Sequence, residues 1–235
     1  MFKKLIHKIQ RWWIKFRLQP IRVFCFHQVS ETFDEATMWA CDWTHIEQFK
    51  HNILRLKEQY EFISLTEATQ KLKHDFFRYK KYAVLTADDG WASLKNIIPW
   101  LVENKVPITL FVNPAYLDGK HYQERESEKL LTKQELQEWA EMYKQYVSIA
   151  SHGWNHKKIS ELSIEQFEQG VLDSEKELAD ISRKIPYYAF TYGVFTVDSV
   201  KILQKHNLYP VLVDGGKNYK DDGYIHRECL DGLVL

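Results

Sequence analysis

Short apolar runs that alternate with amphipathic helical segments constrain the fold of this 235-residue chain most strongly. The runs are rich in β-branched and aromatic residues, and segments with apolar residues at helical spacing separate most of them. This order predicts a mostly parallel sheet with right-handed crossovers. By periodicity alone, a doubly wound open sheet and a closed (β/α) barrel fit equally well. The expected strands are Ile21–Phe26, Glu61–Leu65, Tyr82–Leu85, Pro107–Val112, Tyr146–Ala150, Pro186–Tyr192 and Tyr209–Val213, the last clear strand.

The expected strand Tyr82–Leu85 leads into two adjacent carboxylates. Asp88 and Asp89 follow its end, and Gly90 permits a sharp turn before a helical pattern that begins at Trp91. In parallel α/β folds, chemistry gathers at the carboxyl ends of strands. One carboxylate there could bind a cation while its neighbour handles a proton. The alternative is an ordinary Asp-Asp-Gly turn with two solvated acids.

A second strand also ends in residues that can bind a metal. The run Tyr146–Ala150 leads into His152 and His156, which share a face if this segment makes a helical turn. Together with Asp89 they make a ligand set for Zn²⁺ or a similar divalent ion, with a position left open for water. The alternative is a histidine pair with no ligand role.

The two motifs together resemble those of the polysaccharide deacetylases, the NodB-like carbohydrate esterases. Thr86-Ala-Asp-Asp-Gly90 is similar to the family pattern Thr-Phe-Asp-Asp-Gly, and His152-Gly-Trp-Asn-His156 is similar to the family's His-x-x-x-His motif. The similarity extends from about Ile21 to about Arg227. It implies an α/β fold, an irregular (β/α) barrel of about seven parallel strands. It also implies a metal-dependent hydrolase that removes N-acetyl groups from an N-acetylated sugar or polysaccharide and releases acetate.

The resemblance assigns different roles to the matched residues. Asp89, His152 and His156 would hold the divalent metal, most simply Zn²⁺, and Asp88 would be the catalytic base. The backbone N–H of Tyr192, in a Tyr-Gly pair that matches the family's third motif, would help to hold the oxyanion.

The chain departs from the family pattern at two catalytic positions. The arginine of the third motif falls on Ala189, and the final Leu-x-His motif, the source of the general acid, is absent. Arg227 is the candidate for the missing arginine, because some family members have Leu-Pro-Arg where this chain has Ile-His-Arg. His27 and His226 are the candidates for the missing acid, and the alternatives are a metal-bound group or no acid at all.

The sequence allows more than one interpretation of the substrate contacts and of the exact activity. Trp91 and Trp154 could stack on sugar rings and His27 could line the pocket, but packing within the fold is the alternative for each. Another metal-assisted deacylase or amidohydrolase on the same scaffold is a second functional hypothesis. A non-catalytic glycan-binding relative is a third, and the intact Asp88 argues against it.

The first 19 residues differ in composition from the rest of the chain. Residues 1–19 carry apolar residues at helical spacing, two tryptophans and several Lys and Arg, whereas residues 20–235 form the expected catalytic domain. A basic amphipathic helix of this kind suits an anionic membrane surface. The alternative is a helix packed on its own domain or on a second subunit.

Charge and cysteine content indicate which partners and which cellular compartment to expect. The formal net charge is zero, so no nucleic-acid-binding surface is expected. Cys25, Cys41 and Cys229 have no metal-type spacing and do not suggest a disulfide framework, which favours buried free thiols in a reducing compartment. No stretch is long and apolar enough to span a bilayer. We therefore expect a cytoplasmic protein that residues 1–19 could hold at the inner membrane surface.

Overall fold

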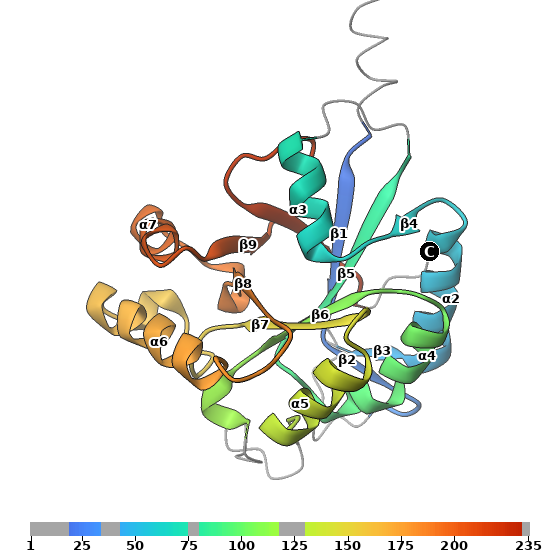
Figure 1. The fold of residues 1–235 in the computed structure, drawn as a ribbon, viewed down its shortest axis with the longest axis horizontal. Helices are drawn as coiled ribbons and strands as arrows, with labels where there is room; N and C mark the ends of the chain where they lie inside the picture. Colours follow the sequence, from blue (N-terminus) through green and yellow to red (C-terminus); the bar gives the residue numbers. More distant parts are fainter. Residues whose placement is uncertain (1–18, 34–42, 75–79, 118–129, 232–235) are drawn as a thin grey trace, which may run out of the picture.

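The computed structural model describes residues 19–33, 43–74, 80–117 and 130–231, and the strands in these ranges form a closed barrel (Figure 1). Seven parallel strands make the described barrel, in the order β1, β10, β9, β8, β7, β6, β5 and back to β1. The predicted seven-stranded barrel is confirmed, and the open doubly wound sheet is wrong because β1 pairs with both β10 and β5. The strands are β1 (Ile21–Phe26), β5 (Tyr82–Ala87), β6 (Ile108–Val112), β7 (Val147–Ser151), β8 (Lys184–Ala189), β9 (Tyr209–Val213) and β10 (Ile225–Cys229).

The barrel is irregular at its closure. The pairing of β1 with β5 runs from Ile21 opposite Tyr82 to Phe26 opposite Ala87. The pairing of β1 with β10 includes only Phe24 with Glu228 and Cys25 with Cys229. A short strand, β4 (Glu61–Phe62), adds to the start of β5 outside the ring. The first and last barrel strands are therefore neighbours although most of the chain separates them in sequence.

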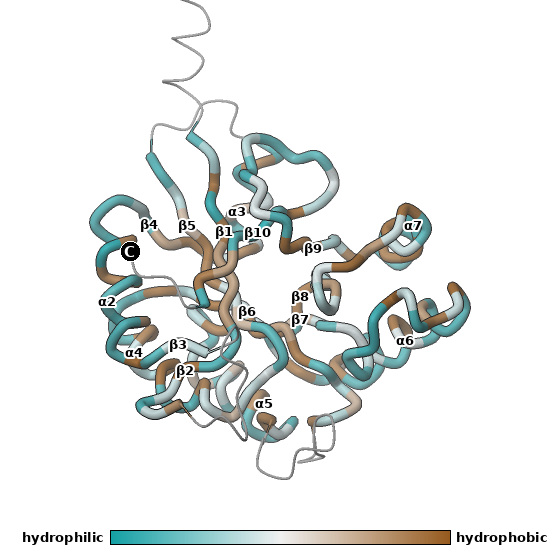
Figure 2. The backbone as a smooth tube through the Cα atoms, turned by 180° about the vertical axis from the view of Figure 1, so that it is seen from behind, coloured by the Kyte–Doolittle hydropathy of each residue, from teal (hydrophilic) through white to brown (hydrophobic). Residues whose placement is uncertain are grey.

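Helices lie around the outside of the strands (Figure 1). Hydrophobic residues run along the barrel strands (Figure 2), and buried apolar side chains of the helices pack with those of the strands in one core. Phe49 of α2, for example, packs on Phe26 of β1 with ring centroids 4.5 Å apart. The helices are α2 (Ile46–Lys57), α3 (Leu65–His74), α4 (Ile98–Glu103), α5 (Lys133–Met142), α6 (Ile164–Glu177) and α7 (Val197–Lys205).

Two local features differ from the expectation. The helical pattern after Trp91 divides into a 3₁₀ segment, Ala92–Asn96, and the short α4. Pro99 lies in the first turn of α4, where its missing N–H costs no hydrogen bond. The strand β10 was not anticipated, because its sequence Ile-His-Arg-Glu-Cys contains three polar residues. Arg227, at the centre of this strand, belongs to the site described below.

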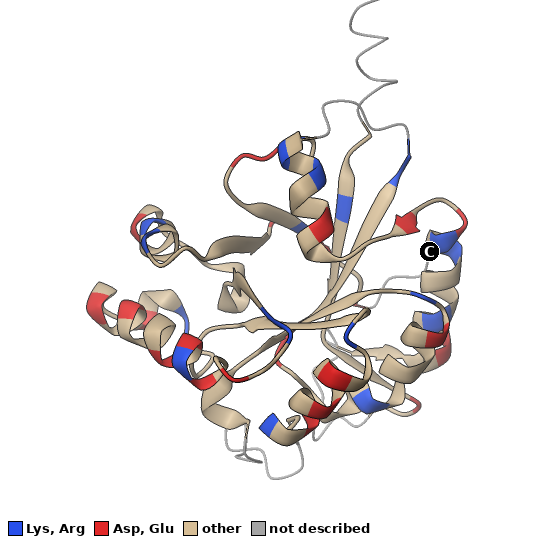
Figure 3. Cartoon of the chain, in the orientation of Figure 1, with Lys and Arg blue, Asp and Glu red and all other residues tan. Residues whose placement is uncertain are grey.

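Charged residues of both signs are mixed over the helices and loops (Figure 3), in keeping with the neutral formal charge. No helix among the described ranges is both long and apolar enough to cross a bilayer. Residues 1–18 lie outside the described ranges, so the membrane-surface helix stays a prediction.

Candidate active site

The barrel register brings polar residues together at one end. Phe26 of β1 lies opposite Ala87 of β5, so the next residues, His27 and Asp88, leave the barrel side by side. The Asp88 N–H donates to the Phe26 carbonyl at 3.0 Å. His152 follows the end of β7 in the same way. These are the carboxyl ends of parallel strands, where barrel enzymes place their chemistry.

Asp89 lies at the centre of one cluster. Its Oδ1 is 3.3 Å from Nε2 of His152 and 3.1 Å from Nε2 of His156. Its Oδ2 accepts a hydrogen bond from the Trp91 indole N–H at 3.0 Å. The tight turn beneath it needs Gly90, whose φ is +76° and at which a Cβ would lie 2.9 Å from a Val112 side-chain carbon.

Backbone contacts orient the two histidines. His152 Nδ1 lies 3.1 Å from the Ala189 carbonyl and donates to it, which turns Nε2 toward Asp89. The segment from His152 to His156 is not the helical turn expected from the spacing. It bends at Gly153, with φ of +79°, and His156 itself has φ of +53°. The bend still places the two rings 5.3 Å apart, with both Nε2 atoms on Asp89.

This cluster fits a divalent cation. Asp89 Oδ1 is buried and makes no hydrogen bond, which is costly for a carboxylate oxygen unless a cation satisfies it. Burial would raise the pKa of Asp89, but the adjoining His152 and His156 rings outweigh it and hold the pKa well below its usual range. One carboxylate and two imidazoles are a donor set that suits Zn²⁺.

Asp88 has a different partner, Arg227 of β10. The guanidinium donates from Nη1 to Asp88 Oδ1 at 2.6 Å and from Nη2 to Oδ2 at 2.8 Å. Nη1 also donates to Thr86 Oγ1 at 3.0 Å, and the arginine side chain is fully buried inside the barrel. Burial would raise the pKa of Asp88, but Arg227 and His152 outweigh it and lower the pKa. Asp88 is thus a buried, ionised and firmly oriented carboxylate.

His27 pairs with a residue that the sequence did not single out, Asp231. The two side chains meet through Nδ1 and Oδ2 at 2.6 Å, and the His27 backbone N–H donates to Asp231 Oδ1 at 3.2 Å. Burial would lower the pKa of His27, but Asp231, aided by the charges of Asp89 and Asp88, outweighs it and raises the pKa well above its usual value. Asp231 was missed because it follows β10, the strand that was not anticipated; with that strand recognised, its place at a carboxyl end would have marked it.

His226, the other candidate for the acid, lies elsewhere. It precedes Arg227 on β10, so its side chain points to the opposite face of the strand from the barrel interior. Its Nδ1 lies 2.7 Å from Asp214 Oδ2, and Nε2 lies 3.7 Å from Asp222 Oδ2. His226 therefore cannot replace the missing acid in this arrangement.

The residues predicted to contact the substrate or the oxyanion differ in how far they are exposed to solvent. The Trp91 ring is 6% exposed and offers almost no face to a sugar, because it packs beside Asp89. Trp154 and His156 line one wall of a pocket of about 250 Å³ against α6. Tyr192 is half exposed, with φ of +56° and its ring centroid 4.6 Å from that of His156. Such strained residues gather at functional sites.

The fold and the site together describe a (β/α)-barrel protein that carries two carboxylates and two histidines at the carboxyl ends of its strands. A family model for polysaccharide deacetylases matches residues 78–211, and the chain belongs to this family. No curated protein matches the sequence.

Solved structures share the fold. IcaB from Ammonifex degensii superposes with a TM-score of 0.76 at 18% identity, over 92% of this chain and 94% of that one. A de-N-acetylase from Aggregatibacter actinomycetemcomitans gives 0.72 at 18% identity, over 91% and 95%. The Streptococcus pyogenes deacetylase PplD, solved with acetate, gives 0.69 at 19% identity, over 91% and 93%.

Proposed function

We propose that this polysaccharide deacetylase is a metal-dependent enzyme that removes N-acetyl groups from an N-acetylated glycan and releases acetate. The observation that carries the proposal is the different pairing of two adjacent carboxylates. Asp89 faces two imidazoles with an unsatisfied oxygen, and Asp88 is held by Arg227. One carboxylate is therefore set up to bind a cation and the other to accept a proton.

Asp89, His152 and His156 would hold the metal. A bound Zn²⁺ supplies Lewis acidity, which polarises an acetyl carbonyl and lowers the pKa of water toward ~7. Asp88 would accept the proton of the attacking water, and the Arg227 contact to both of its oxygens would fix its direction.

Proton donation to the departing amine falls to His27. Its ring emerges beside Asp88, is held through Nδ1 by Asp231, and has a raised pKa, which favours the protonated form that can donate. The Tyr192 backbone N–H would stabilise the oxyanion, in keeping with the family motif that its Tyr-Gly pair matches. These residues supply the acid and the arginine that the sequence motifs lacked, which favours an enzyme over a non-catalytic relative. Two of the structural neighbours, a de-N-acetylase and a deacetylase solved with acetate, point the same way.

Four variants test the division of roles. Asp89→Ala, His152→Ala and His156→Ala should each lose metal and activity together, because each removes one of three protein ligands. Asp88→Asn should keep its metal and lose about 10²–10⁴-fold in turnover, because the amide cannot accept a proton. Metal content and acetate release from a panel of N-acetylated glycans, measured on the same preparations, check both. Full activity in Asp88→Asn, or unchanged metal in Asp89→Ala, contradicts the assignment.

A further inference from the structure

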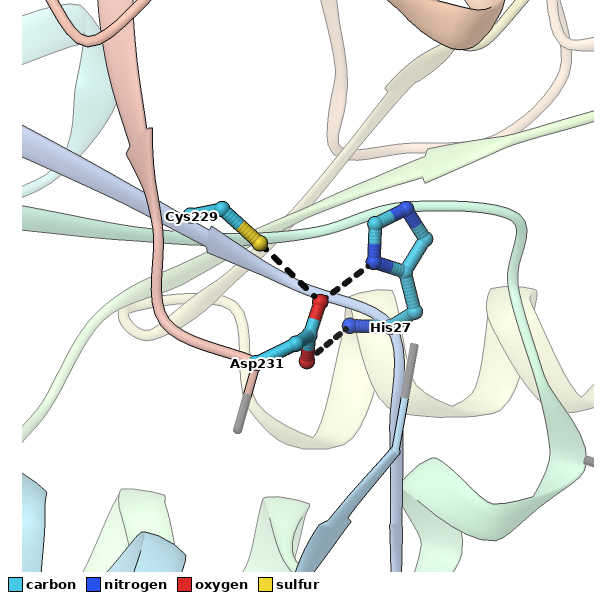
Figure 4. A group of neighbouring side chains, drawn as sticks. All are labelled: His27, Cys229 and Asp231. Atoms are coloured by element: carbon cyan, nitrogen blue, oxygen red, sulfur yellow. Dashed lines mark hydrogen bonds and ion pairs between the residues drawn. The ribbon is translucent and has the colours of Figure 1, made fainter. Parts of the chain in front are cut away.

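A second group of nitrogen, oxygen and sulfur donors lies next to the proposed proton donor. The ligand-type atoms of His27, Cys229 and Asp231 all lie within 4.8 Å of one another. Figure 4 shows the three side chains converging from the ends of β1 and β10. The Cys229 thiol lies 3.3 Å from Asp231 Oδ2, the same oxygen that contacts His27 Nδ1. The reaction proposed above gives Cys229 no role.

We propose that these three residues form a second cation site, for a divalent ion of the Zn²⁺, Co²⁺ or Ni²⁺ type. Thiolate and imidazole ligands select such ions over Mg²⁺ and Ca²⁺, which prefer oxygen. One thiolate and one carboxylate balance the charge of one divalent ion. Zinc bonds of about 2.0–2.3 Å set an imidazole nitrogen and a carboxylate oxygen roughly 3.4 Å apart. The Asp231 oxygen, now 2.6 Å from Nδ1, therefore needs to withdraw by less than ~1 Å.

The surroundings both hold the ligands and admit the ion. The Asp231 side chain is fully buried, and its other oxygen is anchored by the His27 backbone N–H. Cys229 is exposed, which gives the ion a way in. Binding replaces the protons that the donors carry, so Cys229 releases its thiol proton and a protonated His27 ring releases the one on Nδ1. No oxidant or other reactant is required.

Occupancy of this site would inhibit the enzyme, and this consequence depends on the proposed function. With a cation on Nδ1, the His27 ring can give up only the proton on Nε2, which would leave an imidazolate. A metal-bound neutral imidazole is a far weaker acid than the imidazolium that can form while Nδ1 contacts Asp231. Excess Zn²⁺ should then lower the turnover of an enzyme whose Asp89 site is already filled.

Cobalt distinguishes the two sites without an activity measurement. A thiolate bound to Co²⁺ gives a near-ultraviolet charge-transfer band, which the Asp89, His152 and His156 site cannot give because it has no sulfur. The full-length protein, kept reduced, is titrated with Co²⁺ as wild type and as Cys229→Ser. Cys25→Ser is the matched control, because Cys25 lies opposite Cys229 in the pairing of β1 with β10 but is not in the ligand group. Cys41→Ser controls for the remaining cysteine.

The expected result is a thiolate band and a second bound Co²⁺ in wild type, Cys25→Ser and Cys41→Ser, and loss of both in Cys229→Ser. The visible cobalt spectrum of the sulfur-free site reports folded protein in every variant. Absence of the band in wild type, its survival in Cys229→Ser, or its dependence on Cys25 or Cys41 overturns the proposal. If the band follows Cys229 while excess Zn²⁺ leaves turnover unchanged, the cation site stands and the assignment of His27 as proton donor fails.

Discussion

The two sides of the site are built in different ways. On one side, Asp89, His152 and His156 come from two compact motifs after β5 and β7 and meet around one carboxylate oxygen. On the other side, Arg227 of β10 pairs with Asp88 at the end of β5, and Asp231 after β10 pairs with His27 at the end of β1. The metal-type side is local in sequence, whereas the proton-handling side joins the two ends of the barrel.

This difference shows how, with the proposed roles, one end of a barrel can assign cation binding and proton transfer to separate groups of residues. Each acid has a different partner, since Asp89 faces two imidazoles, Asp88 a guanidinium and Asp231 the His27 imidazole, whose pKa it raises. The barrel closure sets these pairs, because β1 lies between β5 and β10. His152 also lowers the pKa of Asp88, and the charge of Asp89 helps to raise that of His27. Substitutions that keep His152 and Asp89 should therefore leave the properties of the proton-handling side in place.

Arg227→Ala should give the largest effect on the proton-handling side. It leaves Asp88 buried without its cation, and breaking a buried ion pair costs about 3–5 kcal/mol of stability. The pKa of Asp88, now lowered by Arg227, should rise, so the acid limb of the rate profile should move to higher pH. Urea unfolding and a pH profile of acetate release measure the two effects. Arg227→Lys should recover part of the stability but not the two-pronged contact.

Arg22→Ala is the matched control. Arg22 also pairs with a carboxylate across β1 and β10, that of Glu228, but both side chains are partly exposed. Such a pair contributes about 0–1 kcal/mol, and its loss should not move the pH profile. Equal losses of unfolding free energy in Arg22→Ala and Arg227→Ala would show that the buried Asp88 pair stabilises the fold no more than a partly exposed pair does.

The same contrast explains what the sequence could and could not predict. The seven-strand barrel and the Asp89, His152 and His156 group followed from strand patterns and two short motifs that resemble those of a known family. Arg227 could be proposed only from a loose match, and Asp231 had no local signal. Both belong to the part of the chain around β10, whose polar residues hide its strand pattern. The contact between His27 and Asp231 spans 204 positions, and only the barrel closure creates it.

Asp231→Asn should act on the alkaline limb of the rate profile. In the proposed reaction the active form of His27 is the imidazolium, so the rate should fall as pH rises through its pKa, which Asp231 raises. Without that charge the pKa drops, and the fall in rate should begin at lower pH. Metal content of the Asp89 site should not change. His27→Gln, which removes the donor, should lose about 10²–10⁴-fold in turnover. An alkaline limb that stays in place in Asp231→Asn would show that His27 is not the group that titrates there.

Trp91→Phe should give the smallest effect, and on the metal-type side alone. The substitution keeps an aromatic ring in the buried position but removes the N–H that donates to Asp89 Oδ2 at 3.0 Å. Residues that orient a metal ligand typically contribute about 10–100-fold in metal affinity. We therefore expect weaker Zn²⁺ binding in a chelator competition, near-normal turnover at saturating metal, and an unchanged alkaline limb. Trp100→Phe is the matched control, because Trp100 packs against the core from α4 and loses a similar ring area. If Trp91→Phe moves the alkaline limb and leaves metal affinity intact, the two sides are not independent, and the separation between cation binding and proton transfer fails at its most direct test.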